Sequence, residues 1–145
     1  AGRGETAGEA IVQTIHPTHY SIQFACRQDY PAFYDRELHF RKAMRYPPAV
    51  SLINAVVRAR TFGAAMDDAA WIVGELRNRD PQLLQYRVLG PAPAPLGKLR
   101  GEYRAQFLMK GTNRKRMREA LVAIMTARPD LARRTTIDVD PVSVL

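Results

Sequence analysis

Three prolines at alternate positions, Pro91, Pro93 and Pro95, limit the possible folds of this chain more than any other feature. Proline fixes the backbone φ angle and has no N–H to donate, so this segment must be extended and cannot be a central strand of a sheet. Residues typical of strands flank it, in 86–89 and 103–109. The pattern predicts a rigid, proline-braced arm between two strands.

A basic segment with flexible glycines follows the prolines. Lys98, Arg100 and Arg104 alternate with Gly97 and Gly101, which predicts a glycine-flexed basic loop between the two strands. A rigid scaffold that presents a basic loop is a common way to hold a polyanion. A plain hairpin connection with solubilising charges explains the same residues equally well.

Pro47-Pro48 separates two different patterns and predicts a domain boundary. Before it, we expect a strand over 9–15, a helix over 19–28 capped by Thr18, and a second helix capped by Asp29. After it, we expect strands over 51–60, 86–90, 102–110 and 135–141, and helices over 62–79 and 113–127. The resulting β-α-β-β-α-β order is typical of an α+β, ferredoxin-like (split βαβ) fold with an antiparallel sheet.

The positive charge of the chain is concentrated in one stretch. The net charge is +8, and residues 96–134 carry 11 lysines and arginines against 3 acidic residues. A local excess of this kind favours a nucleic acid or an acidic peptide as the partner over a neutral small molecule. It does not distinguish between those two partners.

Four cations, Arg114, Lys115, Arg116 and Arg118, open the helix expected over 113–127. Cations at a helix N-terminus oppose the macrodipole, at about 0.3–1 kcal/mol each. A sequence that tolerates this cost can use its cations together with free N–H groups to hold an anion. Arg114 and Arg118 share a helix face and are the predicted contacts, although a solubilising surface is the alternative.

No residue pattern predicts catalysis or a metal site. The three histidines lack a second ligand at helical spacing, and the single Cys26 allows no cysteine-built site. Asp138 and Asp140 fit ordinary edge-strand charges better than metal ligands. The expected strand over 104–110 has Phe107 as its one aromatic residue, which disfavours an RNA-recognition motif. No apolar run is long enough for a membrane span.

Several motifs together resemble the C-terminal end of the PriA family of bacterial replication-restart helicases. The opening AGRG is similar to the tail of helicase motif VI, and GEAIVQTIHPTHYSI is similar to the strand that follows it. The segments QDYPAFYDRELHFRKAMRYPP, LGPAPAPLGKLRGEYRAQFLMK and IDVDP resemble three further family segments, in the family's order. We therefore expect the chain to be part of a longer protein.

The resemblance implies that residues 1–46 end the second RecA-like helicase lobe, with Arg3 as its arginine finger. Residues 47–145 would be the C-terminal domain, which binds forked and single-stranded DNA and the acidic tail of single-stranded DNA-binding protein. Arg114 matches a family contact to that tail, whereas better-known members carry glutamine in place of Arg118. Lys98, Arg100 and Arg104 are the candidate DNA contacts.

The resemblance also implies ATP, magnesium and zinc for the full-length protein, and further primosome proteins as partners in the cytoplasm, at the nucleoid. This chain contains no Walker A lysine, no DEAH-type box and no cysteine-rich region. We therefore expect it to hold no cofactor, to contact no membrane and not to be catalytic alone. The alternative is a purely structural or protein-interaction domain that braces the motor without touching DNA.

Overall fold

The computed structural model describes residues 8–82 and 84–141. The chain divides into two compact units, Ala1–Met44 and Arg45–Leu145. The predicted arginine finger, Arg3, lies outside the described residues.

The first unit contains two helices, α1 (Tyr20–Arg27) and α2 (Tyr30–Ala43). Asp29 caps α2, as predicted, since its Oδ1 accepts the Ala32 N–H at 3.1 Å. His19 caps α1 in place of the predicted Thr18: its Nδ1 accepts the Ser21 N–H at 3.3 Å. The sequence therefore predicted one of the two helix caps of this unit correctly and placed the other one residue too early.

The strand predicted over 9–15 is wrong, because those residues form no regular secondary structure. Ile11 and Ile15 are 88% and 89% exposed. A strand needs a neighbour to receive its backbone hydrogen bonds, and the described part of this unit contains no other strand. The apolar residues of this segment therefore have the spacing of a strand, but the described part of this unit has no sheet that such a strand could join.

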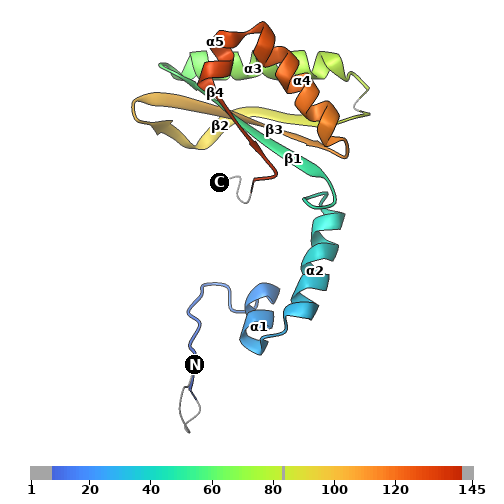
Figure 1. Ribbon diagram of the computed structural model, residues 1–145. Coiled ribbons are helices and arrows are strands. Elements are labelled where there is room, and N and C mark those ends of the chain that lie inside the picture. Colours follow the sequence, from blue (N-terminus) through green and yellow to red (C-terminus); the bar gives the residue numbers. More distant parts are fainter. Residues whose placement is uncertain (1–7, 83, 142–145) are drawn as a thin grey trace. The chain divides into compact units, whose positions relative to one another are not determined.

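The second unit is the predicted α+β, ferredoxin-like domain (Figure 1). Its strands are β1 (Ser51–Ala59), β2 (Arg87–Leu99), β3 (Glu102–Gly111) and β4 (Thr135–Val139), in the spatial order β2-β3-β1-β4. All neighbouring strands are antiparallel. The helices α3 (Phe62–Arg79), α4 (Arg114–Ala127) and α5 (Pro129–Arg134) lie on one side of this sheet (Figure 1).

The core lies between the sheet and its helices. Alternate residues of the two central strands face it, and they are listed here: Ile53, Ala55, Val57, Ala105, Phe107 and Met109. The helices contribute buried side chains at helical spacing: Ala65, Ala69, Ile72, Val73, Leu76, Met117, Leu121 and Ile124. This alternation fixes which side chains of β1 and β3 face away from the helices.

The prolines lie in β2, which is an edge strand, as their chemistry requires. Gly90 has a φ of +103°, and a Cβ there would meet the Gln106 carbonyl oxygen at 3.1 Å, so the bulge in β2 at this point needs glycine. The predicted flexible basic loop is wrong. Pairing with β3 resumes at Lys98 and Leu99, and the connection is a two-residue turn, Arg100-Gly101.

Both residues of that turn have positive φ, 50° at Arg100 and 85° at Gly101, as a tight hairpin turn of the I′ type requires. The turn therefore holds Arg100 at a fixed place at the tip of the hairpin. One further element was missed. The sequence did not predict the short helix α5. Its first residue is Pro129, at a position where the missing N–H of proline costs nothing.

Asp80 ties the end of α3 to the start of β2. Its buried carboxylate accepts backbone N–H groups of Leu84, Gln85 and Tyr86, at 3.1, 2.8 and 3.0 Å. Burial by itself raises the pKa of Asp80, but the three N–H bonds outweigh burial and leave that pKa below its usual value. Folding therefore favours the ionised carboxylate.

We predict that Asp80→Asn lowers the free energy of unfolding by about 1–3 kcal/mol at neutral pH, because Oδ2 accepts two N–H groups that an amide nitrogen cannot accept. The ionised Asp80 stabilises the fold above the usual carboxyl range, and this contribution is lost as pH falls through its lowered pKa. Urea unfolding at several pH values should show the difference shrinking in acid. Asp67→Asn, an exposed carboxylate on the same helix, should change little.

Candidate functional site

The three predicted DNA contacts lie together at the β2–β3 hairpin. Lys98 lies one residue before the end of β2, Arg100 occupies the turn, and Arg104 lies in β3. The Lys98 Nζ is 4.8 Å from the centroid of the Tyr103 ring, and Arg104 Nη1 donates to the Leu96 carbonyl at 3.4 Å. These contacts hold two of the three cations in place beside the turn.

The fold brings further arginines to this end of the sheet, from segments far apart in the sequence. Arg58 of β1 lies directly opposite Arg104 in the strand register. Its Nη2 donates to the Arg133 carbonyl at 3.4 Å, and Arg134 Nη1 donates to the Arg58 carbonyl at 3.5 Å. Arg60 follows β1.

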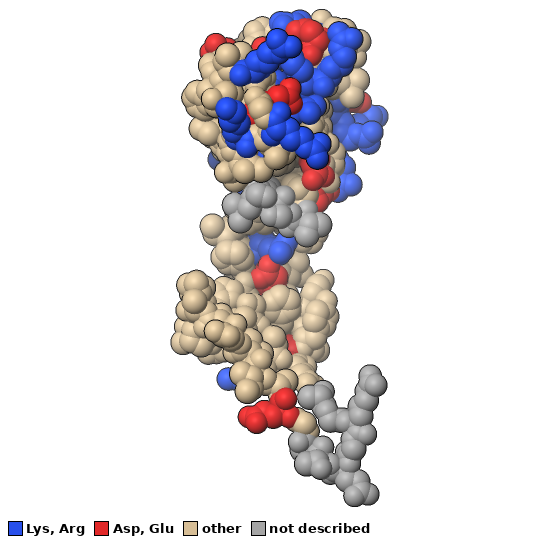
Figure 2. All heavy atoms as spheres, turned by 90° about the vertical axis from the view of Figure 1, so that its left-hand side faces the viewer, with Lys and Arg blue, Asp and Glu red and all other residues tan. Residues whose placement is uncertain are grey.

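We call this cluster the basic end, and its members are Arg58, Arg60, Lys98, Arg100, Arg104, Arg128, Arg133 and Arg134. Figure 2 views the second unit from the side on which the hairpin projects in Figure 1, and lysine and arginine side chains cover much of that surface. Clustering of like charges from separate segments creates a positive potential that no single segment would produce.

Three carboxylates neutralise part of the basic end. Asp68 pairs with Arg134, Glu102 with Arg58 at 3.7 Å, and Asp130 with Arg128 at 2.9 Å. The hydrogen bond from Arg128 lowers the pKa of Asp130 well below its usual value, so this carboxylate is ionised at neutral pH. The side chains of Arg128 and Arg134 are therefore largely committed to structure.

Three cations of the basic end remain uncommitted. The exposed side chains of Arg60, Arg100 and Arg133 have no hydrogen-bond, ion-pair or cation–π partner among residues 8–82 and 84–141. Exposed guanidinium groups without an internal carboxylate are free to contact phosphate. Sequence reasoning found Arg100 but missed Arg60 and Arg133, because only the strand register and the unexpected α5 place them beside the hairpin.

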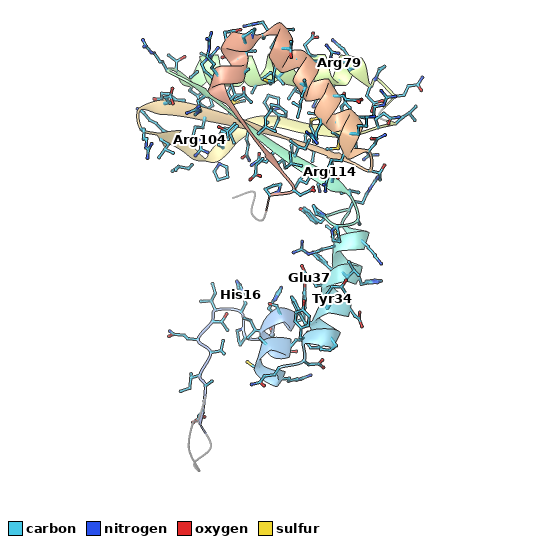
Figure 3. The ribbon with its side chains drawn as sticks, in the orientation of Figure 1. His16, Tyr34, Glu37, Arg79, Arg104 and Arg114 are labelled. Carbon is cyan, nitrogen blue, oxygen red and sulfur yellow. The ribbon has the colours of Figure 1, made fainter. Side chains whose placement is uncertain are left out.

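The second predicted cation pair lies at the other end of the sheet. Arg114 is the first residue of α4, and its Nε donates to the Ser51 hydroxyl at 3.2 Å, at the start of β1. Arg58 lies seven residues further along the same strand. At a rise of about 3.3 Å per residue, the two ends are roughly 23 Å apart. Figure 3 labels Arg104 and Arg114 toward these opposite ends.

Arg114 already holds an internal carboxylate. Its guanidinium forms an ion pair with Asp140, just beyond β4. Asp140 has a positive φ of 50°, and its Oδ1 accepts the Leu52 N–H at 2.8 Å, while its own N–H donates to the Leu52 carbonyl at 2.6 Å. The carboxylate that Arg114 contacts in this structure is therefore an internal one, which the sequence did not predict.

Arg118, one helical turn further, has different surroundings. It lines an apolar groove of about 360 Å³ between α4 and β4, together with Leu121, Val122, Met125, Thr126, Ile53, Ile137 and Val139. No hydrogen bond or ion pair of the Arg118 side chain occurs in the described part of the chain. Of the two predicted partner contacts, Arg114 is therefore paired with an internal carboxylate, whereas Arg118 has no such partner among the described residues.

Two tyrosine rings that could stack on nucleic-acid bases each have a lysine ammonium group over them. The Lys110 Nζ lies 3.9 Å from the centroid of Tyr46, on the face of the sheet away from the helices, and Lys98 covers Tyr103 as described above. Tyr103 also packs edge-on against Phe62. Because a cation lies over each ring, both tyrosines position lysines at the surface.

In the first unit, Glu37 accepts hydrogen bonds from the Tyr20 hydroxyl and from Arg41 Nε. These bonds lower the pKa of Glu37. Among the described residues, no group of three or more His, Cys, Asp or Glu side chains is placed to hold a metal ion. No described helix has the length and apolar composition needed to cross a membrane.

Comparison with known proteins gives a consistent result. The family model described as "Primosomal protein N C-terminal domain" matches residues 42–142. The chain is 34% identical over 146 residues to the replication restart protein PriA of Treponema pallidum, covering 100% of this chain and 22% of that protein. It is 30% identical over 143 residues to the protein of that name from Haemophilus influenzae, covering 97% of this chain and 19% of that protein.

The protein of the same name from Bacillus subtilis is 34% identical over 110 residues, covering 76% of this chain and 13% of that protein. The chain thus spans about a fifth or less of the length of these relatives. The family model covers almost all of the second unit. The matches to the Treponema pallidum and Haemophilus influenzae proteins also extend through the first unit. This chain therefore belongs to the PriA family of replication restart proteins.

Proposed function

We propose that this chain is the DNA- and partner-docking part of a protein that restarts stalled replication forks. Family membership supports the role in replication restart. The observation that carries DNA binding by this part is the basic end, where Arg60, Arg100 and Arg133 are exposed and lack partners in the part of the chain that the structure describes. Such a surface suits the phosphate backbone, which supplies most sequence-independent affinity for DNA.

The proposed DNA contacts are the predicted Lys98, Arg100 and Arg104, extended by Arg60 and Arg133. They come from a hairpin, a strand end and a short helix, so no single recognition helix is available to enter the major groove. Contacts of this kind position a protein on DNA without reading bases. We therefore expect the chain to recognise the charge and shape of forked and single-stranded DNA rather than a sequence.

The start of α4 is the proposed site for the acidic tail of single-stranded DNA-binding protein. Arg114 and Arg118 are the proposed contacts. Because Arg114 already pairs with Asp140, an incoming carboxylate has to share or displace this internal one. The internal pair keeps the guanidinium in position, at the expense of affinity for the peptide.

The remaining activity belongs to the longer protein and is proposed from the family. It would act as an ATP-dependent 3′-to-5′ DNA helicase at the bacterial nucleoid and would assemble with other primosome proteins. Arg3 would contact the γ-phosphate of ATP from motif VI, and magnesium and zinc would bind outside this chain. The alternative is a domain that only docks proteins and braces the motor.

We predict that the double variant Arg60→Glu, Arg133→Glu weakens binding to a labelled forked DNA, because both changes place a carboxylate against phosphate. In fluorescence anisotropy, the plot of log affinity against log salt should become shallower by about 0.9 for each duplex phosphate contact that is lost. The double variant Arg79→Glu, Arg87→Glu makes the same charge change at two other exposed arginines, at the far end of α3 and at the start of β2, and is the matched control. Absent or salt-independent DNA binding by the unmodified chain would instead support the bracing role.

We predict that Asp140→Asn strengthens binding of an acidic peptide several-fold and that Arg114→Ala abolishes it, with DNA binding unchanged in both. Asparagine keeps an oxygen for the Leu52 N–H but removes the charge that competes for Arg114. The probe is an acidic peptide ending in an aromatic carboxylate, measured by anisotropy. Asp138→Asn makes the same charge change two residues away and should have little effect. Equal affinity for Asp140→Asn and the unmodified chain would show that Asp140 does not compete.

A further inference from the structure

The two edges of the sheet differ in their ability to accept another strand. The β2 edge carries three prolines and two irregularities in its pairing, which remove donors and distort the ladder. The β4 edge, Thr135–Val139, contains no proline and no lysine. An edge strand without such features presents free N–H and C=O groups that can pair with another chain.

The direction of the free backbone groups follows from the ladder. The Asp140 N–H donates to the Leu52 carbonyl of β1. In an antiparallel pair, every second residue directs its N–H and C=O to the same neighbour, so Asp138 and Thr136 also face β1. The N–H and C=O groups of Ile137 and Val139 therefore point outward from the sheet.

The same two residues line the groove beside α4. Ile137 lies opposite Ala55 and Val139 opposite Ile53, so their side chains are on the helix-covered face of the sheet. Each is 39% exposed, and Val122, on the α4 side of the groove, is 61% exposed. A strand added beside β4 would thus direct every second side chain into this apolar groove.

The charge around the groove selects the occupant. Arg118 lines it and has no hydrogen-bond or ion-pair partner among the described residues, and Arg114, Lys115 and Arg116 occupy the preceding turn of α4. A second copy of this chain would bring an identical row of cations to the same edge, and like charges in contact oppose association. An acidic, extended peptide meets both the charge and the backbone requirement.

We propose that an acidic peptide of a partner protein binds as a fifth strand on the outer edge of β4. Its alternate side chains, apolar ones and at least one carboxylate that meets Arg118, lie in the groove between β4 and α4. Main-chain hydrogen bonds to Ile137 and Val139 supply affinity, and the groove and Arg118 supply selectivity. This proposal rests on the proposed docking of an acidic tail at the start of α4 and specifies its binding mode.

The test uses the 145-residue chain and a labelled peptide that ends in phenylalanine. Its alternate, groove-facing positions carry valine and one aspartate, and the positions between them carry threonine. A second peptide carries N-methyl groups on the alternate amides that would face β4, and a third has asparagine in place of aspartate. We expect both changes to weaken binding by about tenfold or more, because they remove main-chain donors and charge respectively. On binding of the first peptide, amide exchange at Ile137 and Val139 should slow, while Asp138 should not change.

Two variants locate the binding site. Val122→Asp places a carboxylate at an exposed position in the groove and should weaken binding of the first peptide by about tenfold or more. Thr136→Asp adds the same charge to β4 itself, but on the face of the sheet away from the groove, and should have a much smaller effect.

The outcomes separate this proposal from the proposed function. If no acidic peptide binds at low or physiological salt, docking of the acidic tail itself is wrong. If the peptide binds and needs Arg114, but N-methylation and Val122→Asp change nothing and the exchange at Ile137 and Val139 stays fast, docking stands and strand addition is overturned. Equal affinity for the asparagine peptide would overturn the charge argument.

Discussion

The antiparallel pairing of β1 with β3, from Ser51–Gly111 to Ala59–Tyr103, is the constraint on which the rest of the domain depends. It places both strands at the centre of the sheet, where alternate side chains fill the core under α3 and α4. The same register sets Arg58 opposite Arg104 and directs the start of β1 to Arg114. A slip of one residue would exchange the core face for the solvent face and separate both charge clusters.

The two ends of this central pair present positive charge differently. At the hairpin end, cations from β1, β2, β3 and α5 outnumber the neighbouring carboxylates, and three of them are unpaired among the described residues. At the opposite end, Arg114 is paired internally and Arg118 borders an apolar groove. The first arrangement suits a uniform polyanion, whereas the second suits a ligand that combines a carboxylate with apolar side chains.

Much of the fold could be predicted because its signals are local. The order of the strands and longer helices after Pro48, the edge position of the proline-rich strand and the cap by Asp29 follow from the chemistry of a few residues. The errors arose where the outcome depends on tertiary partners. The segment 9–15 has a strand pattern without a neighbour, and the expected basic loop is shortened to a turn because β2 keeps pairing with β3 to its end. Strand register and helix packing alone place Arg60, Arg133 and Asp140 at the candidate sites, and neither can be derived from the sequence.

The central claim is that the two ends act separately, and a ternary titration tests it most directly. The chain is saturated with the acidic peptide and titrated with labelled forked DNA at physiological salt. Screening there reduces electrostatic coupling beyond about 8 Å, well below the roughly 23 Å between the ends. The account predicts the same DNA affinity with and without peptide. Displacement of one ligand by the other would contradict it, since it would show that DNA and peptide compete for one surface.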